Sequence, residues 1–191
     1  MRKLIVTENI SLDGVIEAKD YWFGPAGEAD PAEPETDQSD LADEIRQQRE
    51  AADAFLVGRI TFEQMRSYWP LQTNDTTGVT DYLNKVAKYV VSASLEDPEW
   101  EPTTVLRGPL RDDIETLKSQ PGAEIVTTGS ITLVHSLIAE GLVDEYRLFV
   151  YPVVVGRGKK LFADFEKMAK LRLLQTRTFA AGIVLLRYAI K

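Results

Sequence analysis

Three short corners in the sequence combine glycine, hydroxyl and arginine side chains in a way that suits anion binding. They are Gly58-Arg59 with Thr61, Ser92-Ala93-Ser94, and Thr128-Gly129-Ser130. The first and third each open an expected helix, whose N-terminus offers free backbone N–H groups and a partial positive charge to a phosphate. Arg59 would add a permanent cation with a bidentate donor fork, and nearby hydroxyls could complete the site. Singly, each corner is more typical of a helix cap or a strand end, and neither common glycine-rich phosphate-binding motif is present.

Other catalytic groups are scarce. The chain has no cysteine, which excludes thiol nucleophiles, disulfides, thiolate zinc sites and iron–sulfur clusters. Its single histidine, His135, cannot form a multi-histidine metal centre, although oxygen-only sites for magnesium or calcium stay open. His135 follows Val134 on an expected helix, where it is more typical of a helix flank than of a catalyst. No motif for an activated serine occurs.

Asp13 is the main acid–base candidate. It belongs to the stretch SLDG at 11–14, directly after the expected first strand. Its carboxyl group could donate a proton or anchor a substrate, but an Asp-Gly pair also closes turns, and that structural role is the more typical one. Trp22 follows the same strand and could wall a pocket. A loop at 156–162 carries three basic residues and either faces an anion or simply covers the sheet edge.

The composition is that of an ordinary globular protein. The 191 residues are 44% apolar and 27% charged, and we expect a single domain over 1–191. The net charge of −8 argues against a general nucleic-acid binder, which needs a basic face. No apolar run is long enough to span a membrane, and Glu8 and Asp13 interrupt any signal-peptide core, so a cytoplasmic location is expected. An acidic loop at about 24–40 is either functional or simply solvated.

Strands and helices alternate over the first two-thirds of the chain, which predicts a mostly parallel α/β sheet flanked by helices. The expected strands lie at 3–9, 53–58, 88–94, 104–108, within 122–129, and at 142–156 with Pro152 interrupting the last. The expected helices lie at 40–50, 59–69, from about 80, at 110–120 and at 130–141. The runs 171–180 and 182–191 predict an antiparallel hairpin that extends the same sheet. Its final strand could form a dimer edge or lie inside one sheet.

The chain resembles the dihydrofolate reductase-like superfamily. Within it, the chain is most similar to the reductase domain of bifunctional riboflavin-biosynthesis enzymes and its stand-alone bacterial relatives. The resemblance runs nearly end to end. It rests on SLDG, on VGRITFE at 57–63, on the closing hairpin and, most specifically, on TGSITLVHSLIAEGLVDEYRLFVYPVVVGRGKKLF at 128–162.

This resemblance implies an NADPH-dependent reductase, commonly a homodimer, and suggests a role for each candidate residue. The phosphate and adenosine side of the cofactor would be held by Gly58, Arg59, Thr61 and Ser92, with Arg59 as the partner of the adenosine 2′-phosphate. The pyrophosphate region would be contacted by Thr128, Gly129, Ser130 and Thr132. The nicotinamide and substrate cleft would be flanked by Asp13, Gly14 and Trp22.

The chain departs from the superfamily pattern at two places. Dihydrofolate reductases and many relatives carry Gly-Gly with a cis bond at the third corner, where this chain has Thr128-Gly129, and a non-proline cis bond is costly. The acidic pteridine-binding residue of dihydrofolate reductases has only Asp43 and Glu44 as loosely aligned candidates, which disfavours folate as the substrate.

The expected reaction is a hydride transfer from NADPH to a planar, polarised C=N or C=O group in a pterin-, pyrimidine- or sugar-like substrate. Reduction of the riboflavin intermediate 5-amino-6-(5-phosphoribosylamino)uracil is its most specific form. Such a reaction depends on positioning more than on acid–base groups, because the cofactor carries the difficult chemistry. The proton would come from Asp13 or from an ordered water. The alternative is a non-catalytic dimer that binds NADPH or another nucleotide and has kept the fold.

Overall fold

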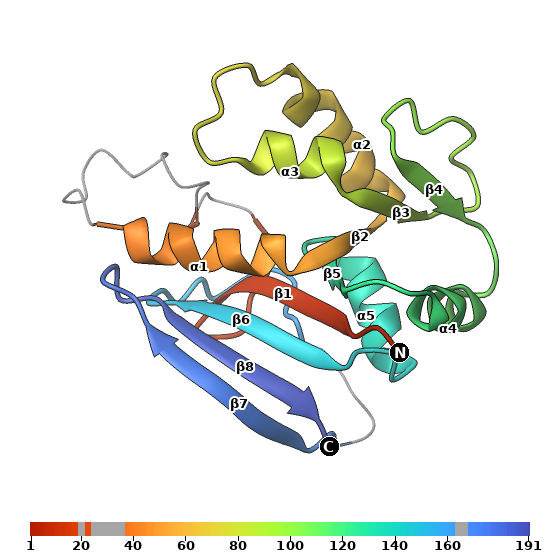
Figure 1. The fold of residues 1–191 in the computed structure, drawn as a ribbon. Helices are drawn as coiled ribbons and strands as arrows, with labels where there is room; N and C mark the ends of the chain where they lie inside the picture. Colours follow the sequence, from red (N-terminus) through yellow and green to blue (C-terminus); the bar gives the residue numbers. More distant parts are fainter. Residues whose placement is uncertain (19–21, 24–36, 163–167) are drawn as a thin grey trace.

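A single eight-stranded sheet organises the chain, as a computed structural model of residues 1–18, 22–23, 37–162 and 168–191 shows (Figure 1). The strand order is β4-β3-β2-β5-β1-β6-β8-β7. Every neighbouring pair is parallel except the two pairs that contain β8. The strands are β1 (Leu4–Ser11), β2 (Ala52–Gly58), β3 (Ala87–Val91), β4 (Thr103–Leu106), β5 (Glu124–Thr127), β6 (Glu145–Tyr151), β7 (Leu171–Thr178) and β8 (Val184–Ile190). The predicted α/β class with a mostly parallel sheet and a C-terminal antiparallel hairpin is therefore confirmed.

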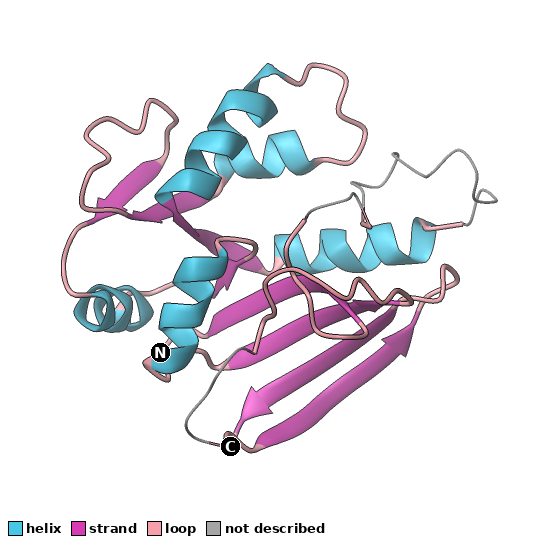
Figure 2. Ribbon diagram, turned by 180° about the vertical axis from the view of Figure 1, so that it is seen from behind, coloured by secondary structure: helices cyan, strands magenta, loops and turns pink. Residues whose placement is uncertain are grey.

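Helices cover both faces of the sheet (Figures 1 and 2). They are α1 (Ser39–Glu50), α2 (Arg59–Tyr68), α3 (Val79–Lys85), α4 (Leu110–Ser119) and α5 (Ile131–Ala139), with a 3₁₀ turn at Trp69–Leu71. Phe62 of α2 and Leu83 of α3 pack with Phe55 and Val57 of β2 on one face. The residues of β2 that alternate with these, such as Leu56, pack with α4 and α5 on the opposite face of the sheet. The period-2 alternation of each strand thus divides the core into layers.

The last strand lies inside the sheet. β8 pairs with β6 on one side and with β7 on the other, so β7 forms the sheet edge. Of the two positions expected for the final strand, the interior one is the position observed, and a dimer edge made by β8 is wrong. The hairpin explains this position, because its second arm, β8, pairs with β6, and its first arm, β7, therefore lies on the outer side of β8. The apolar run of β8 is used within the chain, as Leu185 is fully buried.

The carboxyl edge of the sheet is uneven beside β1. β5 is short and pairs with β1 only as far as Thr127, which lies opposite Val6. β1 continues to Ser11 because all of β6 pairs with it, from Glu145 opposite Ile5 to Tyr151 opposite Ser11. Beyond Val6 the central strand therefore has a neighbour on one side only. β5 and β6 lie on opposite sides of β1, so the chain crosses over β1 between them. Such a crossing is a topological switch point, where ligands of open α/β sheets bind.

Part of the expected acidic loop, 24–36, lies outside the described residues. The helix after it begins at Ser39, one residue before the predicted start at Asp40. In the part of the chain that the structure describes, no helix is long and apolar enough to cross a membrane.

A buried ion-pair network holds the opposite, amino-terminal end of β6. The carboxylate of Glu145 is 1% exposed and accepts hydrogen bonds from Arg147 Nε (2.8 Å) and Arg187 Nη2 (2.7 Å). Arg147 also donates to Glu124 Oε1 at 2.8 Å. Burial alone would raise the pKa of Glu145, but the hydrogen bonds and charges of the two arginines outweigh it and lower the pKa. Sequence analysis did not find this network because its members lie far apart along the chain.

We predict that Glu145→Gln lowers the free energy of unfolding by roughly 3 kcal/mol, because the buried guanidinium of Arg147 and the partly buried one of Arg187 lose a counter-charge. Urea unfolding at pH 7 measures the loss. The folded-state pKa of Glu145 is lowered, so its contribution is complete above the usual value of 4.5 and disappears as the pH falls through the folded-state pKa. The difference in the free energy of unfolding between the wild type and Glu145→Gln should therefore become smaller in acid.

Glu115→Gln is the matched control for this experiment. Glu115 forms an exposed pair with Arg111 one helical turn away, and such a pair contributes less than about 1 kcal/mol. Equal losses in Glu145→Gln and Glu115→Gln would show that the buried network does not stabilise the fold.

Candidate active site

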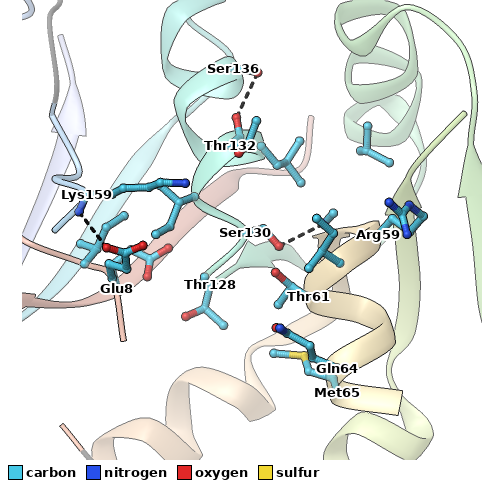
Figure 3. Close-up of a pocket in the computed structure, with 18 of the residues that line it drawn as sticks. Glu8, Arg59, Thr61, Gln64, Met65, Thr128, Ser130, Thr132, Ser136 and Lys159 are labelled. Carbon is cyan, nitrogen blue, oxygen red and sulfur yellow. Dashed lines mark hydrogen bonds between the residues drawn. The ribbon is translucent and has the colours of Figure 1, made fainter. Parts of the chain in front are cut away.

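One large cavity opens at the carboxyl edge of the sheet, and the three predicted corners surround it (Figure 3). Its volume is about 1050 Å³, at the upper end of the range typical of small-molecule sites. All eight residues predicted for the cofactor line it: Gly58, Arg59, Thr61, Ser92, Thr128, Gly129, Ser130 and Thr132. The structure thus brings together corners that are up to 74 residues apart in the chain, from 58 to 132.

Two helix N-termini open onto this cavity. α2 begins after Gly58 and α5 begins after Ser130, and neither helix has a capping side chain. The backbone N–H groups of their first turns are therefore available to a ligand, and both helix dipoles favour negative charge there. The Ser130 hydroxyl accepts the Gly58 N–H at 3.0 Å and so ties the two helix starts together. Its own hydrogen remains able to donate to an anion.

The Thr128-Gly129-Ser130 corner is bent by two successive left-handed residues. Gly129 has φ +61° and Ser130 has φ +49°. The left-handed conformation is open to glycine but costs other residues roughly 1–2 kcal/mol, so Ser130 is held there by its surroundings. A Cβ atom at Gly129 would lie 3.7 Å from Thr61 Cγ2. Among the described residues only Glu101–Pro102 is a cis bond, so the Thr128–Gly129 bond is trans.

Arg59 lies at the edge of the cavity with part of its guanidinium engaged. Its Nη1 donates to Glu63 Oε2 at 2.8 Å, one turn further along α2. The side chain is 40% exposed, which leaves the other N–H groups of the fork open to an anion. Ser92 is more enclosed, because its hydroxyl accepts the N–H groups of Ser94 and Leu95 and closes the turn after β3.

The other end of the cavity is built by Lys159 of the basic loop at 156–162 and by residues that sequence analysis did not assign to a site. Figure 3 shows Glu8 and Lys159 on the side opposite Arg59 and Thr61, with Thr128 and Ser130 between them. Ile16, Glu17 and Phe23 complete this end. A signal for Glu8 was present in the sequence, since a lone glutamate interrupts the apolar run of the first strand. The side-chain direction of Phe23 had no such signal.

Trp22 and Gly14 do not line the cavity. The Trp22 indole N–H donates to the carbonyl of Glu17 at 3.0 Å, and its ring packs edge-on against Phe23 with 4.5 Å between centroids. Trp22 therefore supports Phe23, which is the aromatic wall of the pocket. Gly14 has φ +87° and forms the turn after β1, a conformation that favours glycine.

Asp13 holds a loop and does not face the cavity. Its carboxylate accepts hydrogen bonds from Ser11 Oγ (2.7 Å) and from the backbone N–H groups of Val155 (3.1 Å) and Gly156 (2.9 Å). These bonds, led by that of Ser11, lower its pKa to about 2. An ionised carboxylate that only accepts hydrogen bonds cannot donate a proton at neutral pH. Asp13 is thus absent from the lining of the cavity, and its contacts are those of the structural role in the turn.

The hydrogen bonds from Val155 and Gly156 to Asp13 also place the basic loop at 156–162. Lys159 lines the cavity, while the carbonyl of Lys160 lies 2.8 Å from His135 Nε2 on α5. His135 thus contacts the loop from the flank of its helix. In the described part of the chain, no three histidine, aspartate or glutamate side chains form a group that could hold a metal ion.

Comparison with known proteins identifies the family of this architecture. The RibD C-terminal domain matches residues 2–185. The uncharacterized protein YyaP of Bacillus subtilis (strain 168) is 30% identical over 191 residues, covering 98% of this chain and 94% of its own. The chain belongs to the RibD C-terminal domain family.

Solved structures related to this RibD C-terminal domain share its dihydrofolate reductase-like fold. A putative riboflavin biosynthesis protein from Shewanella sp. PV-4 superposes with a TM-score of 0.71 at 19% identity, over 99% of both chains. A diaminohydroxyphosphoribosylaminopyrimidine deaminase/5-amino-6-(5-phosphoribosylamino)uracil reductase from Thermotoga maritima superposes with a TM-score of 0.64 at 13% identity. That match covers all of this chain and 57% of the Thermotoga protein.

We predict that Asp13→Asn releases the loop at Val155 and Gly156. The amide of asparagine binds two backbone N–H groups less strongly than a carboxylate, so both should exchange their hydrogens faster. Hydrogen exchange followed by NMR measures the effect. In the wild type the folded-state pKa is lowered, so protection should persist in acid until the pH approaches 2.

The amide of Ala180, which donates to Asp40 Oδ2 on another part of the molecule, is the internal reference. Unchanged exchange at Val155 and Gly156 in Asp13→Asn would show that Asp13 does not hold this loop.

Proposed function

We propose that this protein is an NADPH-dependent reductase that transfers a hydride to a C=N or C=O carbon of a small pterin-, pyrimidine- or sugar-like substrate. One observation carries the proposal. A single cavity joins two uncapped helix N-termini and an arginine at one end to a partly apolar compartment at the other. Membership of the RibD C-terminal domain family supports the reductase class.

The residues at the first end fit the anionic half of the cofactor. The N-termini of α2 and α5 would bind the pyrophosphate, and Gly129 lets the backbone approach it without a side chain. Arg59 would bind the adenosine 2′-phosphate through the part of its guanidinium that Glu63 does not occupy. When bound, the cofactor would supply the hydride, and the chain would supply position.

The second end fits the nicotinamide and a planar substrate. Ile16 and Phe23 offer apolar surface to flat rings, and Lys159 offers a cation at the wall of the compartment. A pyrimidine that carries a phosphate group would use both features. The uracil derivative in the name of the Thermotoga protein has this chemistry and heads the list of substrates to test. Assembly as a homodimer remains a prediction, which light scattering would check.

The first test is cofactor binding followed by turnover. Purified protein is titrated with NADPH and with NADH while nicotinamide fluorescence is recorded. NADPH oxidation is then followed at 340 nm with a substrate panel that contains 5-amino-6-(5-phosphoribosylamino)uracil. Binding of NADPH with turnover supports the proposal. Binding without turnover across the panel would favour a non-catalytic binding protein, and the absence of binding at sub-millimolar cofactor would overturn both.

We predict that Arg59→Ala weakens NADPH binding by about tenfold or more, because hydrogen bonds to charged groups contribute roughly 1.5–3 kcal/mol. NADH lacks the 2′-phosphate, so its affinity should change by less than about twofold on the same argument. Both affinities come from the fluorescence titration. Glu63→Gln should act in the opposite direction, because it removes the carboxylate that competes for the Arg59 guanidinium.

Arg46→Ala is the matched control, since Arg46 is an exposed arginine that pairs with Asp43 on α1 and lies outside the cavity. Equal losses of NADPH and NADH affinity in Arg59→Ala would remove Arg59 from the 2′-phosphate site.

A further inference from the structure

Glu8 stands in the middle of the apolar face of the central strand. Leu4, Val6 and Ile10 alternate with it along β1 and belong to the main core beneath α5. Its partner across the β1–β6 pair is Leu148. The residue is 3% exposed, yet it lines the cavity. A carboxyl group at this depth costs free energy unless it is paired or neutral.

No cation pairs with Glu8 among the interactions of the described residues. Its Oε1 atom is buried and has no hydrogen-bond partner. One backbone hydrogen bond from Gly129, at the bend of the third corner, is its compensating contact. Thr127, the last residue of β5, also has a buried hydroxyl without a partner, and it lies opposite Val6 on the same strand pair. Of these two groups Glu8 lines the cavity, and an unsatisfied polar atom there indicates a site that a ligand completes.

The surroundings of Glu8 favour its neutral form. Burial raises its pKa well above the usual 4.5, against a smaller lowering by the Gly129 hydrogen bond. The face that covers it is apolar on α5, through Leu133 and Val134, and on β6. The charged residues that line the same end of the cavity are Glu17 and Lys159, and the backbone N–H of Lys159 donates to the Glu17 carboxylate at 3.3 Å. A protonated carboxyl group is both a hydrogen-bond donor and an acid.

We infer that Glu8 is the proton donor of the reduction, and that the substrate turns the heteroatom of its C=N or C=O bond toward this side chain. This inference rests on the proposed function. The hydride from the reduced nicotinamide would form the new C–H bond as the π bond breaks. The carboxyl proton of Glu8 would pass to the nitrogen or oxygen, and the nicotinamide would leave oxidised. Glu8 would remain as a carboxylate and take its next proton from solvent.

This assignment also limits the substrate class. A neutral carboxyl group surrounded by aliphatic side chains donates its hydrogen to a ligand atom that has a free lone pair and no negative charge. An imine nitrogen and a ring carbonyl oxygen are such atoms. An anionic group on the substrate would instead lie toward Lys159. Asp13 cannot replace Glu8, because its carboxylate is ionised and bound to the loop at Val155 and Gly156.

The first test needs neither cofactor nor turnover. Protein labelled with carbon-13 at the glutamate side-chain carboxyl is titrated by NMR, and the Glu8 resonance is assigned as the signal that Glu8→Gln removes. We expect this carboxyl group to remain protonated at pH 7. Titration of the Glu8 signal in the ordinary range near 4.5 would overturn the assignment, whatever the activity of the protein.

The second test compares NADPH binding with turnover in Glu8→Gln. Glutamine matches the shape and neutrality of a protonated glutamate, so the variant should fold and keep its NADPH affinity. It cannot deliver an acidic proton, and turnover should fall by about 100-fold or more. Glu8→Asp should restore part of the rate with a shifted pH profile, which a purely structural role would not produce. Glu115→Gln, on the exposed side of α4, is the control.

The outcomes separate the two proposals. If wild type neither binds nor oxidises NADPH, the proposed function fails and the role of Glu8 fails with it. If wild type turns over and Glu8→Gln turns over equally well, the assignment of Glu8 alone is wrong. Retained NADPH affinity with lost turnover in Glu8→Gln, together with a protonated carboxyl group at pH 7, supports the assignment.

Discussion

β5 pairs with β1 only as far as Thr127, and there the chain turns away through Gly129 and Ser130 into α5. The rest of the site depends on this early stop. Because β6 continues to pair with β1 up to Ser11, the central strand stays extended while one of its sides is uncovered. The cavity lies along that uncovered side. The bend also aims the N-terminus of α5 at the space where α2 already begins, and the hydrogen bond from Gly58 N–H to Ser130 Oγ fixes the two helix starts together.

Two buried glutamates, Glu8 and Glu145, show how position decides the state of a carboxyl group. Glu145 and Glu8 lie on the neighbouring strands β6 and β1, and both are nearly inaccessible to solvent. Arg147 and Arg187 surround Glu145, so its pKa is lowered and it serves as a permanent anion in the framework. Glu8 has no such partner, so its pKa is raised. Titratable groups in opposed environments are a mark of functional sites, and of the two only Glu8 lines the cavity.

Much of the fold could be predicted from the sequence because the signals for it are local. Alternation of apolar strands with amphipathic helices indicated a mostly parallel sheet, and most expected elements agree with those observed to within a few residues. The expected strand 142–156 was too long, since β6 ends at Tyr151, just before Pro152. The place of β8 could not be predicted. A strand with apolar residues on both faces can lie at an edge or inside a sheet, and only the pairing with β6 and β7 decides between them.

By itself, the sequence determined the residue types at each corner and the resemblance to reductases, and with them eight residues that line the cavity. Those residues were accessible to sequence reasoning because glycine turns and helix starts leave a local pattern. The tertiary structure decided the second end. It bound Asp13 to the loop at Val155, turned Phe23 instead of Trp22 into the cavity, and left Glu8 without a partner. Each of these depends on contacts between distant segments, and the protonation of a carboxyl group is set by such contacts and not by its neighbours in the chain.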